Sequence, residues 1–215
     1  ESKYSPRWAR DIFMISNLKE FIPINSLGYV NSLIENEKIE IKIVNERSTK
    51  HGDFKRTVNG DYIITINKFS NQFRFLLTLI HELAHYFVTL EFKNSKPHGN
   101  LWKNRFRNLL NPILNELVFP RDLLKHLINH MKNPKSSFSY DIELSKVIDK
   151  YDLNEKEYSY LDEIDDGQIF VYGDGNKFIK NKKRRKRYLC TNLLTKRQYL
   201  FLGNAKVKIY ENSSN

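Results

Sequence analysis

The 215-residue chain is predicted to be an α+β protein, with a helix-rich N-terminal domain and a small β-rich C-terminal unit. Two patterns in the sequence lead to this prediction. Apolar residues recur at helical spacing over residues 72–91, whereas residues 169–209 hold short alternating runs separated by glycines. Hydrophobic residues make up 40% of the chain and charged residues 28%, which is typical of a globular protein and excludes an extended disordered chain.

Helices and a small sheet are expected before residue 70. Residues 17–36 show helical apolar spacing interrupted by a proline, which predicts one short and one longer helix. Residues 39–43 and 62–66 are short runs rich in isoleucine, which predict strands. The turn signal Asn59-Gly60-Asp61 predicts that the second strand pairs with one near residues 54–57, in a small antiparallel sheet.

The strongest helix signal covers residues 72–91, and Asn71 is placed to cap its first turn. Two further helices are expected at residues 101–110 and 121–131. The acidic residues 141–149 are expected to form a short helix.

The chain is expected to divide into a domain at residues 1–140, an acidic helical linker at residues 141–166 and a basic β-rich unit at residues 167–215. The net charges of these segments are +8, −7 and +10, within a total of +11. Short strands are predicted in the last segment at residues 169–172, 188–190, 199–201 and 207–209.

The single cysteine, Cys190, excludes an intramolecular disulfide framework and a cysteine-based zinc ribbon. A metal must therefore be held by histidines and carboxylates. The sequence shows no run of 18 or more apolar residues and no secretory leader pattern, so we expect a cytoplasmic protein without a membrane segment.

The long helix contains the sequence His81-Glu82-Leu83-Ala84-His85. Two histidines four residues apart project from one helix face, so both imidazoles can bind one zinc ion at roughly 2.0–2.1 Å. Glu82 lies beside that face, where its carboxylate can act as a general base on a metal-bound water. Apolar neighbours favour this interpretation over two solvated histidines, because unpaired polar groups against a core are costly.

A zinc hydrolase needs a third protein ligand and one open position for water. His98 is the favoured candidate, because it follows His85 across a loop with a proline and a glycine that can return the chain to the helix. Glu116, on a later helix, is the alternative. Glu91 is expected to point away from the site.

The other histidines are expected to have different roles. His126 and His130 lie four residues apart on a predicted helix, but no glutamate or third ligand accompanies them. We therefore expect a solvated helix face there rather than a second metal site. His51 is expected to be a turn residue, and Tyr86 is expected to pack against its neighbours.

Several segments resemble the SprT-like, Spartan-related zinc metalloproteases, in particular their small bacterial members of the Bacteroidetes type. The resemblance covers roughly residues 17–210. It is carried by His81-Glu82-Leu83-Ala84-His85-Tyr86, by Pro97-His98-Gly99 with Trp102-Lys103, by residues 47–54 and by residues 186–207.

The resemblance implies a zincin-like metalloprotease fold for residues 1–140. It implies that His81, His85 and His98 bind one Zn²⁺ ion and that Glu82 is the general base. It also implies a protein substrate that is bound or crosslinked to DNA, with DNA, single-stranded or crosslinked, as a partner. Many members of the family end in a four-cysteine zinc ribbon, which Cys190 alone cannot form.

A basic run extends over residues 180–187, inside a window from Lys177 to Lys208 with twelve basic residues and no acidic one. Such a run can bind phosphates, and Tyr188, Tyr199 and Phe201 are close enough in sequence to stack on unpaired bases. The alternatives are a solvated hairpin, or a surface covered by the acidic residues 152–166. The candidate nucleic-acid contacts are Lys180, Lys182, Lys183, Arg184, Arg185, Lys186 and Arg187.

The leading hypothesis is a zinc-dependent endopeptidase of the SprT-like type that cleaves DNA-bound or DNA-crosslinked proteins, as DNA repair requires. One alternative is a non-proteolytic nucleic-acid-binding module with a structural zinc site. Another is a zinc-dependent hydrolase of a different substrate, because the motif defines how water is activated and not which bond is cleaved.

Overall fold

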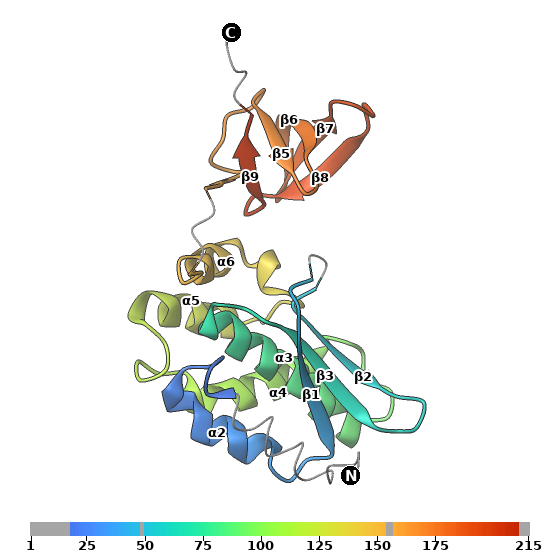
Figure 1. The fold of residues 1–215 in the computed structure, drawn as a ribbon, viewed down its shortest axis with the longest axis vertical. Coiled ribbons are helices and arrows are strands. Elements are labelled where there is room, and N and C mark those ends of the chain that lie inside the picture. Colours follow the sequence, from blue (N-terminus) through green and yellow to red (C-terminus); the bar gives the residue numbers. More distant parts are fainter. Residues whose placement is uncertain (1–17, 48–49, 154–156, 211–215) are drawn as a thin grey trace, which may run out of the picture. The chain divides into compact units, whose positions relative to one another are not determined.

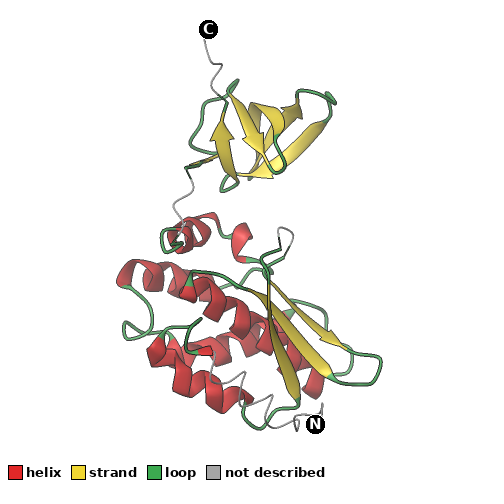
Figure 2. Cartoon of the chain, viewed as in Figure 1, coloured by secondary structure: helices red, strands yellow, loops and turns green. Residues whose placement is uncertain are grey.

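The computed structural model describes residues 18–47, 50–153 and 157–210, so residues 1–17 of the expected first domain lie outside the description (Figure 1). The chain forms two compact units. Unit 1 consists of the chain up to Pro134 together with Lys150–Leu153, and unit 2 consists of Lys135–Asp149 and the chain from Asn154 onward. Helices and two sheets are both present, which confirms the α+β class (Figure 2).

The sheet of unit 1 has the strand order β1-β3-β2. The strands β2 (Gly52–Arg56) and β3 (Tyr62–Asn67) form the predicted antiparallel pair. In contrast, β1 (Ile39–Val44) pairs in parallel with the other side of β3, so the expectation of an antiparallel sheet is wrong for this strand. Alternating isoleucines define the buried face of a strand, but they do not define the direction of its neighbour.

The central helix of unit 1 is α3 (Gln72–Glu91), with the predicted bounds. The Asn71 side-chain oxygen accepts hydrogen bonds from Phe73 N at 3.1 Å and Arg74 N at 3.0 Å, which confirms the predicted cap. Most side chains of α3 are buried, so packing fixes both the position and the rotation of this helix.

Further α-helices in the described part of unit 1 lie with α3 on one side of its sheet (Figure 2). They are α2 (Ile24–Ile34), α4 (Asn100–Leu110) and α5 (Arg121–Met131). Pro23 lies at the N-cap of α2, which confirms the predicted interruption and the longer helix. Of the predicted short helix, Leu18 is helical, but residues 19–21 form a turn. No helix in the described part of the chain is long and apolar enough to cross a membrane.

Unit 2 contains a sheet with the strand order β4-β9-β5-β6-β7-β8, in which neighbouring strands are antiparallel. Its core is a cluster of buried residues that includes Phe170, Phe178 and Val207. The strands are β4 (Ser159–Tyr160), β5 (Ile169–Tyr172), β6 (Asn176–Arg184), β7 (Arg187–Asn192), β8 (Gln198–Leu202) and β9 (Lys206–Ile209).

The boundaries of the two units differ from those expected for the acidic linker. The predicted helix α6 (Ile142–Asp149) forms, but it belongs to unit 2, as does the short 3₁₀-helix η2 (Phe138–Tyr140). Asp149 binds Lys206 Nζ at 2.9 Å, and Lys146 Nζ binds Asp162 at 2.7 Å. Asp149 and Asp162, two acidic residues of the expected helical linker, therefore form ion pairs within unit 2.

Candidate metal centre

The helix α3 presents His81 and His85 one turn apart on the same face, with their ring centroids 5.1 Å apart. The residues between and beside them, including Ile80, Leu83 and Ala84, are fully buried. Because this packing fixes the rotation of α3, the two imidazoles are held at the boundary between the core and the surface.

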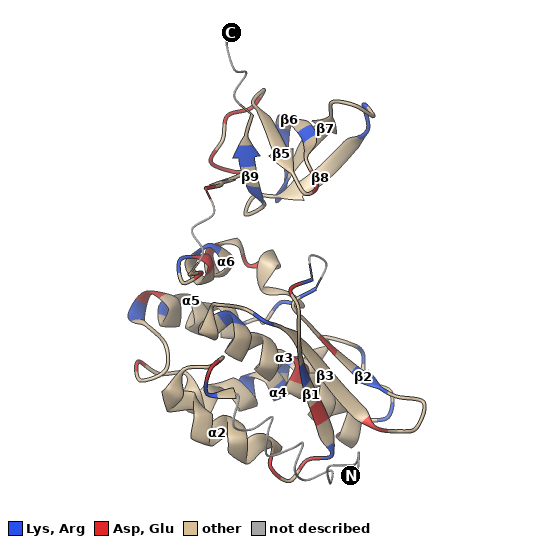
Figure 3. Ribbon diagram, in the orientation of Figure 1, with Lys and Arg blue, Asp and Glu red and all other residues tan. Residues whose placement is uncertain are grey.

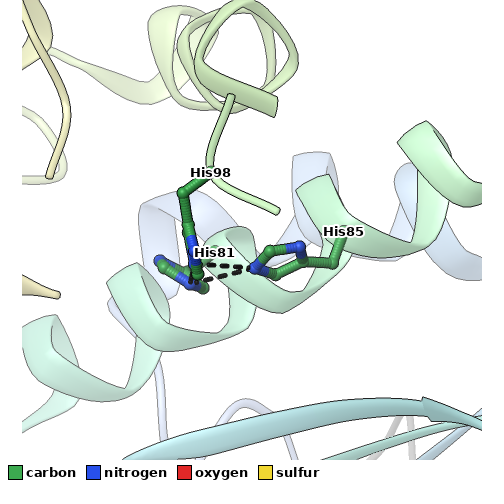
Figure 4. A group of neighbouring side chains, drawn as sticks. All are labelled: His81, His85 and His98. Carbon is green, nitrogen blue, oxygen red and sulfur yellow. Dashed lines mark hydrogen bonds between the residues drawn. The ribbon is translucent and has the colours of Figure 1, made fainter. Parts of the chain in front are cut away.

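His98 reaches the same place from the loop between α3 and α4. It has a φ of 56°, in the left-handed region that non-glycine residues rarely occupy. Gly99 follows as the N-cap of α4, and its N–H donates to Lys96 O at 2.9 Å. This tight turn brings the His98 ring over α3, where it faces His81 and His85 (Figure 4).

The Nε2 atoms of the three histidines form a triangle (Figure 4). The distances are 3.1 Å between His81 and His98, 3.3 Å between His81 and His85, and 3.0 Å between His85 and His98. A neutral imidazole has one N–H only, so three converging Nε2 atoms cannot satisfy one another as donors and acceptors. This group can hold a metal ion, and the structure thus brings together all three ligands predicted from the sequence.

Burial keeps these imidazoles neutral, which is the form that binds a metal. Desolvation is the largest cause for each histidine, and it lowers the pKa of His85 from 6.5 to about 4. The pKa of His81, the most deeply placed ring, lies well below 6.5 because of burial and the neighbouring histidines. The pKa of His98 is lowered by burial as well.

Glu82 lies next to His81 in the sequence and is only 7% exposed. Burial and then the nearby Asp53 raise the pKa of its carboxyl from 4.5 to about 8, while Lys50 and Arg47 act in the opposite direction. A buried carboxyl with such a pKa, on the residue that follows one member of the three-histidine group in the sequence, is typical of a residue that accepts and donates protons.

Trp102 is a site residue for which the sequence predicts no chemical role. Its ring, 1% exposed, lies against all three histidines, with centroid distances of 4.6 Å to His81, 5.5 Å to His85 and 4.8 Å to His98. Its indole N–H donates to the His81 carbonyl oxygen at 3.4 Å. The first turn of α4 thus places an apolar ring against all three histidines. Only the three-dimensional arrangement shows this role.

The alternative ligands lie elsewhere. Glu116 pairs with Arg121 at 2.9 Å, and Glu91 pairs with Arg105 of α4. Neither belongs to the three-histidine group. These positions favour His98 as the third ligand over both glutamates.

The histidines of α5 differ from the solvated face expected for them. His126 is partly exposed, but His130 is 2% exposed and meets the ring of Phe106 edge-on at 6.5 Å. The expectation is therefore wrong for His130, because this residue lies with Leu127 and Met131 on the buried side of α5. His51 directly precedes β2 and packs against Phe69. Tyr86 is buried and donates to Glu37 at 2.7 Å, which confirms that it packs.

The basic run of unit 2 forms most of β6 and the turn into β7 (Figure 3). Lys180 is 4% exposed, and its Nζ donates to Ile164 O at 2.5 Å and lies 4.5 Å from the centre of the Tyr188 ring. It therefore serves the core of unit 2, and the expectation of a surface contact is wrong for this residue. The other candidates are exposed: Lys182, Lys183, Arg184, Arg185, Lys186 and Arg187.

An open groove of about 750 Å³ borders this surface and is lined in part by Asn181, Lys182, Arg184 and Gln198. Of the aromatic residues expected to stack on bases, Tyr188 is buried, whereas Tyr199 is 43% exposed. Two of the acidic residues that could cover the basic run are paired elsewhere, since Asp162 and Glu163 both bind Lys146.

The chain was compared with protein-family models, with curated proteins and with solved structures, and none of them matches it.

Proposed function

We propose that the chain is a zinc-dependent endopeptidase of the SprT-like type with a zincin-like catalytic domain. The observation that carries the proposal is the convergence of the His81, His85 and His98 Nε2 atoms on a helix whose next residue after His81, Glu82, has a buried carboxyl. Three imidazoles and one adjacent carboxyl are the groups that hydrolytic zinc sites use.

The geometry fits zinc. Nitrogen ligands at roughly 2.0–2.1 Å in a tetrahedral arrangement are about 3.3 Å apart, close to the 3.0–3.3 Å between the Nε2 atoms. Within the described residues, no fourth histidine, cysteine or carboxylate joins the group. With these three histidines as ligands, a bound zinc ion would keep a fourth position for water, which favours a catalytic site over a structural zinc site with four protein ligands.

When bound, zinc supplies Lewis acidity that polarises a carbonyl group and acidifies a coordinated water, and its charge favours the ionised form of a nearby carboxyl. Glu82 accepts the proton of the attacking water on its carboxylate and then passes it to the leaving amine. The histidines stay neutral throughout, because burial opposes their protonation.

A polypeptide substrate is supported by the position of β2. This strand pairs with β3 on one side and forms one edge of the sheet within the described residues. Its first residue, Gly52, lies directly against Glu82. An extended peptide can add to such an edge through main-chain hydrogen bonds, which would bring its peptide bonds close to Glu82.

The test is cleavage of an unfolded protein substrate by the zinc-loaded chain and by its Glu82→Gln variant. We expect cleavage by the parent chain, loss of cleavage in the variant with zinc content unchanged, and full activity in the control Glu116→Gln. A structural zinc site predicts no cleavage by either chain. Cleavage by Glu82→Gln at the parent rate would contradict the proposed mechanism.

We further propose that the substrate is protein bound or crosslinked to DNA, supported by the exposed basic residues beside the groove of unit 2. Binding of a single-stranded oligonucleotide should weaken as salt rises, with a slope that falls by about 0.7 for each phosphate that the protein no longer neutralises. Replacing Lys182 and Arg184 by alanine should reduce the slope, whereas the same change at the exposed Lys125 and Lys132 of unit 1 should not. Equal slopes for both variants would contradict this assignment.

A further inference from the structure

The first residue of β2 lies in close contact with α3. A Cβ atom on Gly52 would be 2.7 Å from Glu82 Oε1, 2.7 Å from Thr78 Cγ2 and 2.9 Å from Glu82 Cγ. All three distances are shorter than any that a packed side chain tolerates. The space above Gly52 is therefore filled by the side chain of Glu82 and by the methyl group of the residue one helical turn before it.

Backbone conformation does not explain a glycine at this position. The φ of Gly52 lies outside the left-handed region, whereas Gly60, in the turn after β2, has a φ of 86°. Gly28, in α2, would bring an added Cβ atom within 4 Å of no other group and gives a neutral comparison. What position 52 requires is the absence of a side chain.

Neither wall of this contact can move easily. On the strand side, Asn67 is fully buried, its N–H donates to His51 O at 2.9 Å, and its side-chain amide donates to Lys50 O at 2.9 Å. On the helix side, the Thr78 hydroxyl donates to Arg74 O at 2.8 Å, which fixes the rotamer of this β-branched side chain.

We propose that Gly52 is a positioning residue for Glu82. The β2 backbone at Gly52 and the Thr78 methyl group form a wall against which the Glu82 carboxyl is held in one position. The catalytic consequence of this inference rests on the proposed function, whereas the contact itself does not. The inference gives a physical role to Gly52, for which the sequence alone predicts no chemistry.

The first test compares Gly52→Ala with the parent chain. We expect zinc affinity and KM to change little and kcat to fall, by about 100-fold if the carboxyl moves by about 1 Å. The matched control Gly28→Ala, the same substitution without a neighbour, should keep the parent kcat. An unchanged kcat in folded, zinc-loaded Gly52→Ala would overturn the proposal.

A rescue variant separates positioning from general damage to the fold. Thr78→Ser removes Cγ2 and keeps the hydroxyl, so it opens space on the helix side of residue 52. The double variant Gly52→Ala/Thr78→Ser should therefore be more active than Gly52→Ala, and the fall in kcat caused by Gly52→Ala should be smaller in the Thr78→Ser background than in the parent chain. A double variant that is no more active than Gly52→Ala would contradict the proposed contact between residue 52 and the Thr78 methyl group.

A measurement that needs no activity completes the test. In the metal-free chain, Gly52→Ala should lower Tm by several degrees, and by clearly less when Glu82 has been replaced by alanine. If Gly52→Ala lowers Tm equally in the parent chain and in Glu82→Ala, the proposed contact between residue 52 and Glu82 is contradicted. If the zinc-loaded parent chain cleaves no protein, the proposed function fails, and this cycle of Tm values still decides whether Gly52 positions Glu82.

Discussion

The Nε2 atoms of His85 and His98 lie 3.0 Å apart, although His85 belongs to a buried helix and His98 to a loop thirteen residues later. His98 reaches this place through a left-handed backbone conformation that costs free energy for any residue other than glycine. The strained turn and the converging rings occur together, as expected where a loop is shaped to complete a site.

His98 should be the third ligand. Replacing it by alanine should lower zinc affinity by more than the roughly 10–100-fold typical of losing an outer-shell partner, because a direct ligand is removed. Titration with zinc against a competing chelator measures this. The same change at Glu116, which pairs with Arg121, should leave the affinity unchanged, and the opposite ranking would assign the ligand to Glu116.

Trp102 should support the ligands without binding the metal. Trp102→Ala should destabilise the chain by roughly 3–5 kcal/mol, as for other large buried side chains, and should weaken zinc binding by about 10–100-fold. Trp102→Phe should lose less of both. Phe119→Leu, a change at a fully buried residue that is not among the rings in contact with these histidines, should affect stability only. If Trp102→Ala and Phe119→Leu bind zinc with equal affinity, Trp102 has no special role in supporting the histidines.

Protonation of His85 at acidic pH should destabilise the fold of the metal-free chain. The folded-state pKa of His85 is about 4 against 6.5 in the unfolded chain, so the unfolded state binds more protons between these values. The stability that depends on the neutral ring is present above pH 6.5 and is lost as the pH falls through about 4. The unfolding free energy of the parent chain relative to that of His85→Gln, measured with denaturant, should therefore fall as the pH is lowered from 7 to 4. A difference that does not change with pH would contradict the assignment.

Ionisation of Glu82 at alkaline pH should destabilise the fold of the metal-free chain. Because its pKa is raised from 4.5 to about 8, the folded state retains a proton that the unfolded state has released. The associated stability is fully present below pH 4.5 and is lost as the pH rises through 8. Tm values of the parent and Glu82→Gln should therefore diverge between pH 5 and pH 9, with the variant losing less. Parallel curves would show that Glu82 is not buried as described.

The sequence was sufficient to predict the elements that depend on local patterns. The bounds of α3, the Asn71 cap and the β2–β3 pair follow from apolar spacing and turn residues close together in the chain. The parallel pairing of β1 could not be predicted, since partner direction depends on contacts far apart in the sequence. The three-histidine group was predictable because His81 and His85 share one helix and His98 lies in a loop marked by a proline and a glycine.

The basic residues of unit 2 show where composition misleads. Lysine and asparagine have low strand propensity, so β6 was not expected, although its apolar residues Phe178 and Ile179 pair with β7. Lys180 looked like a surface residue because charge alone does not show which side of a strand faces the core. The roles of Gly52 and Trp102 were also not predictable, because each depends on a contact between separate elements.

The most direct test of the central claim is X-ray absorption at the zinc edge of the zinc-loaded chain. We predict one zinc ion per chain with three imidazole nitrogens at about 2.0–2.1 Å and one light-atom ligand from solvent, and loss of one imidazole in His98→Ala. A sulfur ligand, a fourth protein ligand or the absence of stoichiometric zinc would contradict the catalytic zinc site proposed for His81, His85 and His98.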